Sequence, residues 1–232
     1  MSGAAKSRTN LRYLDPSDFT PQFGCRKSPS GAREVYCEGV SLAAIAERFG
    51  TPAYVYSRRA IEDAYDELDR GLGKFPHLLC FAVKANGNLS ILKLLAQRGS
   101  GFDIVSGGEL DHLGHLGVRG DRIVFSGIGK SREEIRAALR YRAFAKQAQG
   151  ILQFNVESAA ELEVLLEESS RLGSAVDAAP GVSIRVNPDV KAGGHPHIST
   201  GLHEHKFGLD WPAQKRWGEG SSKGARKPRA RT

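Results

Sequence analysis

The sequence has no run of about 20 consecutive apolar residues, the length that a membrane-spanning helix requires. Its first residues, MSGAAKSRTNLRYLDPSD, also lack an apolar segment that could act as a secretory signal. We therefore expect a cytoplasmic protein that does not engage a membrane. Hydrophobic residues make up 40% of the chain and charged residues 25%, which is sufficient for a buried core.

Cysteine is scarce. The chain has three cysteines, Cys25, Cys37 and Cys80, and none forms a Cys-x-x-Cys pair. An odd number without such a pair argues against a disulfide framework and against a thiolate zinc site. We expect reduced thiols, which is compatible with the cytoplasm.

Acidic residues are nearly absent from one end of the chain. Residues 211–232 contain seven of the 33 Lys and Arg residues but one of the 26 Asp and Glu residues. The formal net charge of +7 therefore comes almost entirely from this tail. The tail is rich in Gly and Ser and lacks apolar periodicity, so we expect it to be disordered. A disordered end is favoured over a nucleic-acid-binding arm.

Between residues 81 and 188, runs rich in β-branched and aromatic residues alternate with segments of helical period. Three helix starts carry the pattern Ser-x-x-Glu, which predicts a capping box at each. Repeated strand-helix units imply parallel strands covered by helices, in a barrel or an open doubly wound sheet. The predicted strands are 81–85, 102–106, 122–126, 151–156 and 182–186, and the predicted capping boxes begin at Ser106, Ser131 and Ser158.

Polar side chains lie in or just after every predicted strand. A (β/α)8 barrel builds its site from many successive strand ends, whereas an open sheet concentrates its ligand groups at one switch point. We therefore predict an α/β fold, an incomplete TIM-type (β/α)8 barrel, with a possible sixth unit beginning at 206–209. These polar residues are Lys84, Asp103, Ser106, Ser126, Asn155, Glu157, Arg185 and Asn187.

The predicted domain organisation has four parts. They are a variable segment at 1–32, a strand and helix segment at 33–57, the incomplete barrel at 58–210 and the basic tail at 211–232. Upstream of the barrel repeat we predict strands at 35–38 and 53–57 and helices at 42–49 and 58–72.

Lys84 lies in the apolar run LLCFAVKAN, on the opposite strand face to Phe81 and Val83. A lysine inside a strand-lined cavity loses its hydration, and its neutral amine can form a Schiff base with an aldehyde. From this strand alone, a lysine with its ammonium group in solvent is the favoured alternative.

The segment FAVKANGN resembles the Y-A-x-K-A-N segment of the alanine-racemase-like barrel decarboxylases, in which the lysine binds pyridoxal 5'-phosphate. Further similar segments follow in the same order: GFDIVSGGEL, IVFSGIGKSREEI, ILQFNVESAAELE, IRVNPDV and HPHISTGLHEHKFG. The last is similar to the diaminopimelate decarboxylase form of the family. The resemblance covers about residues 33–210.

The resemblance implies a role for four residues: Lys84 holds the cofactor, Asp103 and Glu109 lie beside it, and Arg185 is a family arginine of the site. It also implies decarboxylation of meso-2,6-diaminopimelate to L-lysine in lysine biosynthesis, by an enzyme that takes a small amino acid and forms a homodimer. Ornithine or arginine decarboxylation, or a non-catalytic barrel fragment, are the alternatives.

The residues alone leave other roles open. Asp103 can be a buried turn acid and Glu109 a simple capping glutamate. A guanidinium in an apolar strand requires acceptors, so a structural ion pair of Arg185 with Asp103 or Glu157 explains it as well as a substrate contact does.

Two features depart from the family pattern. The later family elements, including the glycine-rich phosphate loop and the C-terminal β domain, do not follow residue 210. We therefore expect a truncated chain with impaired activity. Residues 140–150, RYRAFAKQAQG, resemble an insertion, which either an extended helix accommodates or a damaged gene model explains.

Two rival sites are disfavoured. The segment GIGKS, 127–131, resembles part of a phosphate-binding P-loop, but Val124 stands where that pattern requires glycine. A histidine-rich loop could suggest a metal site, yet Gly and Pro in it leave little to hold ligands in fixed geometry. Its residues are His195, His197, His203, Glu204 and His205.

Overall fold

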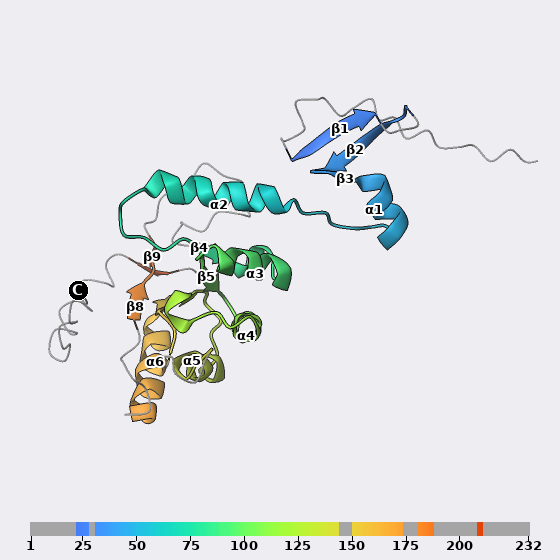
Figure 1. Ribbon diagram of the computed structural model, residues 1–232. Helices are drawn as coiled ribbons and strands as arrows, with labels where there is room; N and C mark the ends of the chain where they lie inside the picture. Colours follow the sequence, from blue (N-terminus) through green and yellow to red (C-terminus); the bar gives the residue numbers. More distant parts are fainter. Residues whose placement is uncertain (1–21, 28–30, 144–149, 174–180, 188–207, 211–232) are drawn as a thin grey trace, which may run out of the picture. The chain divides into compact units, whose positions relative to one another are not determined.

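The computed structural model describes part of the chain (Figure 1). The chain forms two compact units, Met1–Phe75 and Pro76–Thr232. Among the described residues, no helix has the length and apolar character needed to cross a membrane. The predicted domain boundaries stay predictions. The described residues are 22–27, 31–143, 150–173, 181–187 and 208–210.

The first unit is a small antiparallel sheet with two helices. Its strands pair in the order β1, β2, β3, with Cys25 opposite Val35. The helices α1 and α2 have the predicted bounds. The predicted strand at 53–57 does not form, because no strand among the described residues pairs with this segment to supply hydrogen bonds. The elements are β1 (Phe23–Lys27), β2 (Arg33–Cys37), β3 (Val40–Ser41), α1 (Leu42–Phe49) and α2 (Arg58–Leu72).

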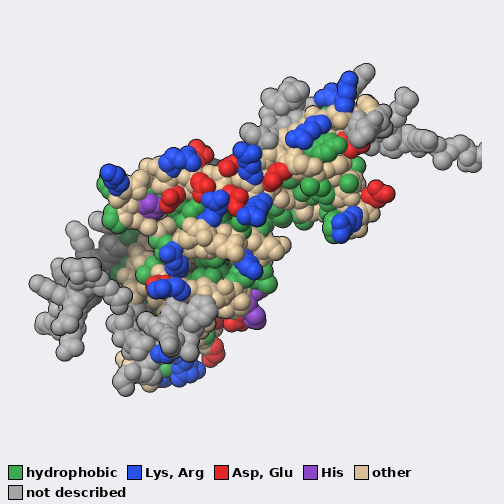
Figure 2. Space-filling view, in the orientation of Figure 1, with side chains coloured by type: hydrophobic (Ala, Val, Ile, Leu, Met, Phe, Trp, Pro, Cys, Tyr) green, Lys and Arg blue, Asp and Glu red, His purple; other side chains and the backbone are tan. Residues whose placement is uncertain are grey.

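Charges of both signs are interspersed along α2, as Figure 2 shows for one face. Arg58 pairs with Glu62 at 3.0 Å, and Arg59 pairs with Asp63 at 3.5 Å, each one helical turn apart. Exposed pairs of this kind each stabilise a helix by about 0.3–0.5 kcal/mol. Basic and acidic side chains therefore alternate along this helix and pair with one another.

The second unit is a five-stranded parallel sheet whose strand order equals the sequence order, β4-β5-β6-β7-β8. One α-helix lies between each pair of successive strands. A doubly wound sheet would reverse its strand order at a switch point, so the uninterrupted order is that of a barrel. The elements are β4 (Cys80–Ala82), α3 (Leu89–Gln97), β5 (Gly101–Ile104), α4 (Gly107–His115), β6 (Ile123–Phe125), α5 (Arg132–Leu139), β7 (Gln153–Val156), α6 (Ala159–Leu172) and β8 (Gly181–Ile184).

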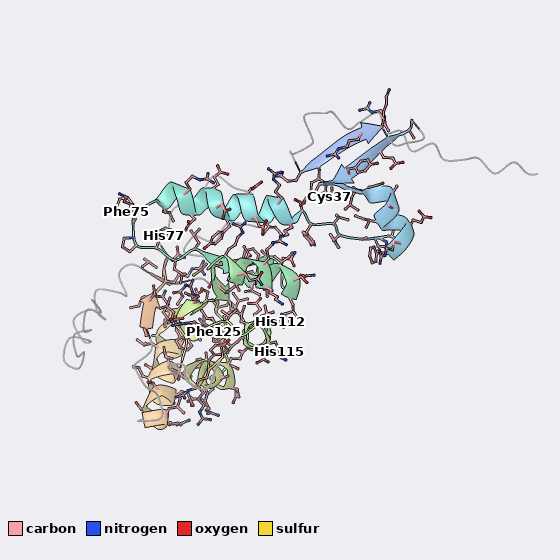
Figure 3. The ribbon with its side chains drawn as sticks, viewed as in Figure 1. Cys37, Phe75, His77, His112, His115 and Phe125 are labelled. Atoms are coloured by element: carbon pink, nitrogen blue, oxygen red, sulfur yellow. The ribbon has the colours of Figure 1, made fainter. Side chains whose placement is uncertain are left out.

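The core of this unit lies between the sheet and its helices. Phe125 of β6 stacks on Phe154 of β7 with ring centroids 6.1 Å apart, and both side chains are fully buried. Figure 3 shows Phe125 among densely packed side chains. Burial of a Phe side chain stabilises the fold by about 1.5–3 kcal/mol. The helices are thereby held on the sheet that carries the strand ends.

Two predictions about strand ends need correction. The strand before Lys84 ends at Ala82, and the short 3-10 helix η3 (Val83–Ala85) follows it. The predicted strand at 182–186 is interrupted at Arg185. Strand β8 ends at Ile184, and β9 (Val186–Asn187) follows and pairs in parallel with β10 (Leu209–Asp210). The predicted sixth unit at 206–209 lies partly outside the described residues.

The predicted capping boxes form completely at one of three helix starts. At α5, Ser131 Oγ accepts from Glu134 N, and Glu134 Oε2 accepts from Ser131 N at 2.8 Å. At the other two, the serine hydroxyl caps as predicted, but the glutamate carboxylate accepts from the amide one residue earlier. Glu109 Oε2 accepts from Val105 N at 2.6 Å, and Glu161 Oε2 from Glu157 N at 3.0 Å.

Backbone conformation accounts for the difference. The N-cap residues Ser106 and Ser158 have φ of −154° and −153°, whereas Ser131 has φ of −75°. The more extended backbone turns the preceding amide, rather than the N-cap amide, toward the carboxylate. The Ser-x-x-Glu pattern is the same at all three helix starts, so it does not predict the φ angle of the N-cap serine.

The predicted insertion at 140–150 does not extend a helix, because α5 ends at Leu139. Gly150 N donates to Tyr141 O at 2.9 Å, which joins the two ends of the segment. Tyr141 Oη donates to Val118 O at 2.7 Å, and burial raises the pKa of Tyr141 to about 12. Residues 144–149 lie outside the described residues.

Candidate functional site

A cavity of about 670 Å³ lies at the carboxyl ends of the parallel strands of the second unit. Strands β4 to β8 each contribute a polar side chain to its wall, either from the strand itself or from the residues that follow it. The loop Gly127–Gly129, between β6 and α5, forms part of the wall as well. The polar side chains of the wall are those of Lys84, Asp103, Ser126, Asn155, Ser183 and Arg185, with Glu157 beside them.

Lys84 lies in η3, directly after β4, and lines the cavity. Its neighbour Val83 is 1% exposed and anchors this turn in the core. The Lys84 side chain is exposed, so the loss of hydration expected from the sequence does not occur in this chain. Among the described residues, no hydrogen bond or ion pair engages its amine. A primary amine therefore lines the cavity at this position.

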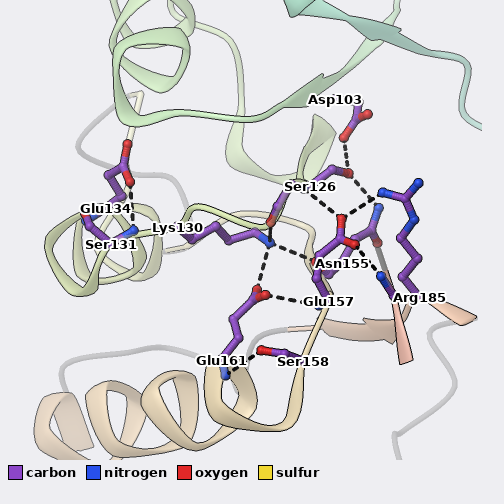
Figure 4. A network of polar contacts seen from close by, with 12 residues as sticks. Asp103, Ser126, Lys130, Ser131, Glu134, Asn155, Glu157, Ser158, Glu161 and Arg185 are labelled. Atoms are coloured by element: carbon purple, nitrogen blue, oxygen red, sulfur yellow. Dashed lines mark hydrogen bonds and ion pairs between the residues drawn. The ribbon is translucent and has the colours of Figure 1, made fainter. Parts of the chain in front are cut away.

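A chain of hydrogen bonds crosses three strands and ends on Asp103 (Figure 4). Gln153 Nε2 donates to Asn155 Oδ1 at 2.9 Å, and Asn155 Nδ2 donates to Ser126 Oγ at 2.9 Å. The Ser126 hydroxyl in turn donates to Asp103 Oδ1. An ionised carboxylate accepts only, so each donor in the chain points toward Asp103. The arrangement fixes one oxygen of Asp103 at the cavity wall.

Arg185 lies between β8 and β9, and its guanidinium Nη1 is 2.9 Å from Glu157 Oε1. The Glu157 side chain is 2% exposed and the Arg185 side chain 40% exposed. Glu157 also accepts from Gly127 N at 3.2 Å and from Gly208 N at 3.1 Å. Of the two carboxylates proposed from the sequence as partners of Arg185, Glu157 forms this ion pair. The buried carboxylate holds a cation whose other face reaches the cavity.

Glu109 occupies a different place from the other three predicted site residues. Its carboxylate accepts from Val105 N at the start of α4, and Glu109 is not among the residues that line the cavity. Its effect on the site passes through Val105, which does line the cavity. The structure therefore brings Lys84, Asp103 and Arg185 together at the cavity, whereas Glu109 does not line it.

Lys130 of the GIGKS segment points inward. Its side chain has no exposed surface, and Nζ lies 2.7 Å from Glu161 Oε1. A P-loop lysine must reach a phosphate outside the loop, so this orientation does not fit a P-loop. Sequence reasoning considered Lys130 only as a phosphate ligand and missed the internal pairing, since no local pattern links it to Glu161.

The described residues contain no cluster of three His, Cys, Asp or Glu side chains that could hold a metal ion. The histidine-rich loop considered above lies outside the described residues. His112 and His115 of α4 are exposed, and Figure 3 shows both at the margin of the packed side chains.

The residues of the cavity fit a phosphorylated aldehyde. The Lys84 amine can condense with an aldehyde, and the Arg185 guanidinium matches a phosphate or carboxylate group in shape and charge. The cavity volume of about 670 Å³ is that of a small-molecule site. Pyridoxal phosphate carries both an aldehyde and a phosphate, so the donor set is compatible with it.

Comparisons with known proteins agree with this geometry. The family model described as pyridoxal-dependent decarboxylase, pyridoxal binding domain, matches residues 58–219. Diaminopimelate decarboxylase of Pseudomonas fluorescens is 54% identical over 177 residues, which is 76% of this chain and 40% of that protein. The Pseudomonas aeruginosa enzyme is 52% identical over 176 residues, with the same coverage.

Solved structures give the same result. Diaminopimelate decarboxylase from Helicobacter pylori, complexed with L-lysine, superposes with a TM-score of 0.68 at 38% identity, covering 78% of this chain and 43% of that one. The chain thus spans about 40% of the length of the curated relatives it matches. The predicted fold, an incomplete (β/α)8 barrel, is confirmed. The cavity at the strand ends agrees with the family model and with these relatives. Together they show that the chain belongs to the pyridoxal-dependent decarboxylase family.

Proposed function

We propose that this chain supplies the lysine-bearing part of the active site of a decarboxylase that uses pyridoxal 5'-phosphate and converts meso-2,6-diaminopimelate to L-lysine. The observation that carries this proposal is the meeting of the Lys84 amine and the Arg185 guanidinium at one cavity. It occurs in a chain that is 54% identical to a diaminopimelate decarboxylase.

Each predicted site residue has a role in this proposal. Lys84 would hold the cofactor, because its primary amine can condense with the aldehyde group of pyridoxal phosphate. Arg185, held by Glu157, pairs with an anionic group of the cofactor or substrate. Asp103 orients the ligand with the oxygen that does not accept from Ser126, and Glu109 fixes the turn that follows Asp103. When bound, pyridoxal phosphate supplies an electron sink for the electron pair left by the departing α-carboxylate.

The rest of the proposal follows from the family. The substrate is a small amino acid, the intact enzyme is a homodimer, and it works in the cytoplasm in lysine biosynthesis. A non-catalytic barrel fragment is the second candidate, because the chain spans 40% of the length of the relatives. Ornithine or arginine decarboxylation is less well supported. The relatives from Pseudomonas fluorescens and Pseudomonas aeruginosa, at 54% and 52% identity, are both diaminopimelate decarboxylases.

The experiment is a titration of the purified chain with pyridoxal phosphate, followed by borohydride reduction and peptide mapping. We expect a visible imine absorption band that reduction converts into a stable adduct at Lys84. The variant Lys84→Ala should lose both, whereas Lys93→Ala, which removes an exposed lysine of α3, should keep both. Equal labelling of the wild type and Lys84→Ala would contradict the proposal.

A second step separates the candidate substrates. If the chain recognises meso-2,6-diaminopimelate, this compound should perturb the imine band at a lower concentration than ornithine or arginine does. A chain that binds the cofactor at Lys84 but releases no CO2 from any of the three would support the fragment alternative.

A further inference from the structure

The ammonium group of Lys130 contacts the loop Gly127–Gly129, which lines the cavity and is called the rim loop below. Its Nζ donates to Gly127 O at 2.6 Å, to Asn155 O at 2.9 Å and to Glu161 Oε1 at 2.7 Å. These three acceptors match the three N–H donors of an ammonium group. The Phe125 ring adds a cation–π contact, with its centroid 5.6 Å from Nζ. A buried charge without partners is strongly disfavoured. The four contacts therefore hold the ammonium group of Lys130 at this one position.

Lys130 and Glu157 hold Gly127 from two sides. The Gly127 carbonyl accepts from Lys130 Nζ, while the Gly127 amide donates to Glu157 Oε1 at 3.2 Å. Both side chains are buried, since Lys130 is 0% and Glu157 2% exposed. Gly127 lines the cavity. Its backbone is therefore held by two charged side chains that are themselves buried.

Lys130 also holds the strand that carries the hydrogen-bond chain. Its second backbone acceptor belongs to Asn155, whose side chain donates to Ser126 and so leads to Asp103. One buried ammonium group thus contacts both the rim loop and strand β7, whose Asn155 belongs to the hydrogen-bond chain that ends on Asp103. Neither contact places Lys130 within the cavity, because Lys130 is not among the residues that line it.

We propose that Lys130 is a positioning residue, which fixes the rim loop Gly127–Gly129 and Asn155 in the arrangement that binds the cofactor. The inference rests on the proposed function and deepens it. It assigns the GIGKS segment a role that differs from that of a P-loop, with the lysine turned toward the protein instead of toward a phosphate. Loss of the ammonium group releases the rim while leaving Lys84 and Arg185 in the chain.

The test uses the full chain with Lys130→Met and measures amide hydrogen exchange at 126–129 and 153–156. The matched control is Arg136→Met. Arg136 lies in α5, the helix that begins just after Lys130, and its Nε pairs with the buried Glu168 of α6 at 2.7 Å, but it contacts neither the loop Gly127–Gly129 nor Asn155. We expect exchange at these amides to rise on the order of tenfold in Lys130→Met and to stay near the wild-type rate in Arg136→Met. The dissociation constant of pyridoxal phosphate should rise on the order of tenfold in Lys130→Met alone.

Lys130→Met leaves Glu161 buried without its cation, and the double variant Lys130→Met with Glu161→Gln removes that unpaired charge if the single variant fails to fold. Unchanged rim exchange in the folded variant, or the same increase in Arg136→Met, overturns the proposal. So does a rim that loosens while cofactor affinity stays at the wild-type value. If the rim loosens but the wild type forms no imine, the anchoring role of Lys130 stands and the proposed function fails.

Discussion

Glu157 Oε1 lies 2.9 Å from Arg185 Nη1, so a carboxylate that is 2% exposed orients a guanidinium that is 40% exposed. The two residues are 28 positions apart, and the pair joins the end of β7 to the end of β8. Because Arg185 remains partly hydrated, the pair is an orienting contact more than a source of stability.

Glu157→Gln tests a second role of Glu157, which accepts hydrogen bonds from two backbone amides in addition to orienting Arg185. The variant keeps the volume of the side chain but removes the charge that aligns Arg185 and weakens the acceptor for Gly127 and Gly208. We expect a loss of about 1–3 kcal/mol in the free energy of unfolding, measured by urea titration. Glu163→Gln, an exposed position of α6, should lie within about 0.5 kcal/mol of the wild type. Equal stability of the two variants would show that the hydrogen bonds from Gly127 and Gly208 to the Glu157 carboxylate do not stabilise the fold.

Glu168 makes stability depend on acidity. Hydrogen bonds from Arg136 and Arg132 lower the pKa of Glu168 from 4.5 to about 2. Because the folded-state pKa is the lower one, this stabilisation is present above pH 4.5 and is lost as the pH falls toward 2. The measurement is the midpoint of urea unfolding across this range. Glu168→Gln should flatten the pH dependence, and an unchanged slope would contradict the assignment.

Gly127→Ala tests the shape of the rim. Gly127 has φ of +94°, a left-handed conformation, and an added Cβ would lie 3.4 Å from Val105 Cβ. We expect a loss of about 1–3 kcal/mol in unfolding free energy and weaker binding of pyridoxal phosphate. Gly129→Ala is the matched control, since a Cβ there meets nothing within 4 Å. If both variants behave like the wild type, the rim is not held in this conformation.

Ser126→Ala interrupts the hydrogen-bond chain to Asp103. The substitution leaves the Asp103 oxygen and the Asn155 amide without their shared partner. We expect a stability loss of about 1 kcal/mol and a fall in cofactor affinity. Calorimetry of cofactor binding checks the second effect, with Ser90→Ala on α3 as an exposed control. Unchanged affinity would mean that Asp103 does not depend on Ser126 for its orientation.

The regular elements were largely predictable because their signals are local. Hydrophobic period, the N-cap serines and the glycines that end helices predicted the parallel strand-helix repeat, and the bounds of α1 and α2 agree with the sequence prediction. The strand before Lys84 was predicted too long. Asn86 N donates to Val83 O at 3.0 Å, which turns the backbone at a place where the alternating pattern of FAVKA still reads as a strand.

The site was predictable only in part, because its contacts join residues that are far apart in sequence. Lys130 pairs with Glu161 across 31 positions, and Glu157 accepts from Gly208 across 51. No spacing rule identifies such pairs before the strands are aligned. The polar strand ends, by contrast, recur once per unit, which is why the location of the cavity followed from the pattern while the internal contacts of Lys130 and Glu157 did not.

The hydrogen bond from Gly150 to Tyr141 has a practical consequence for anyone who labels this protein. It closes the neck of the segment between them, so the length of that segment is uncoupled from the register of β7. Doubling the length of such a closed segment costs only about 0.6 kcal/mol. A fluorescent or affinity tag inserted between Tyr141 and Gly150 should therefore leave the cavity at the carboxyl ends of the strands able to report on its ligand.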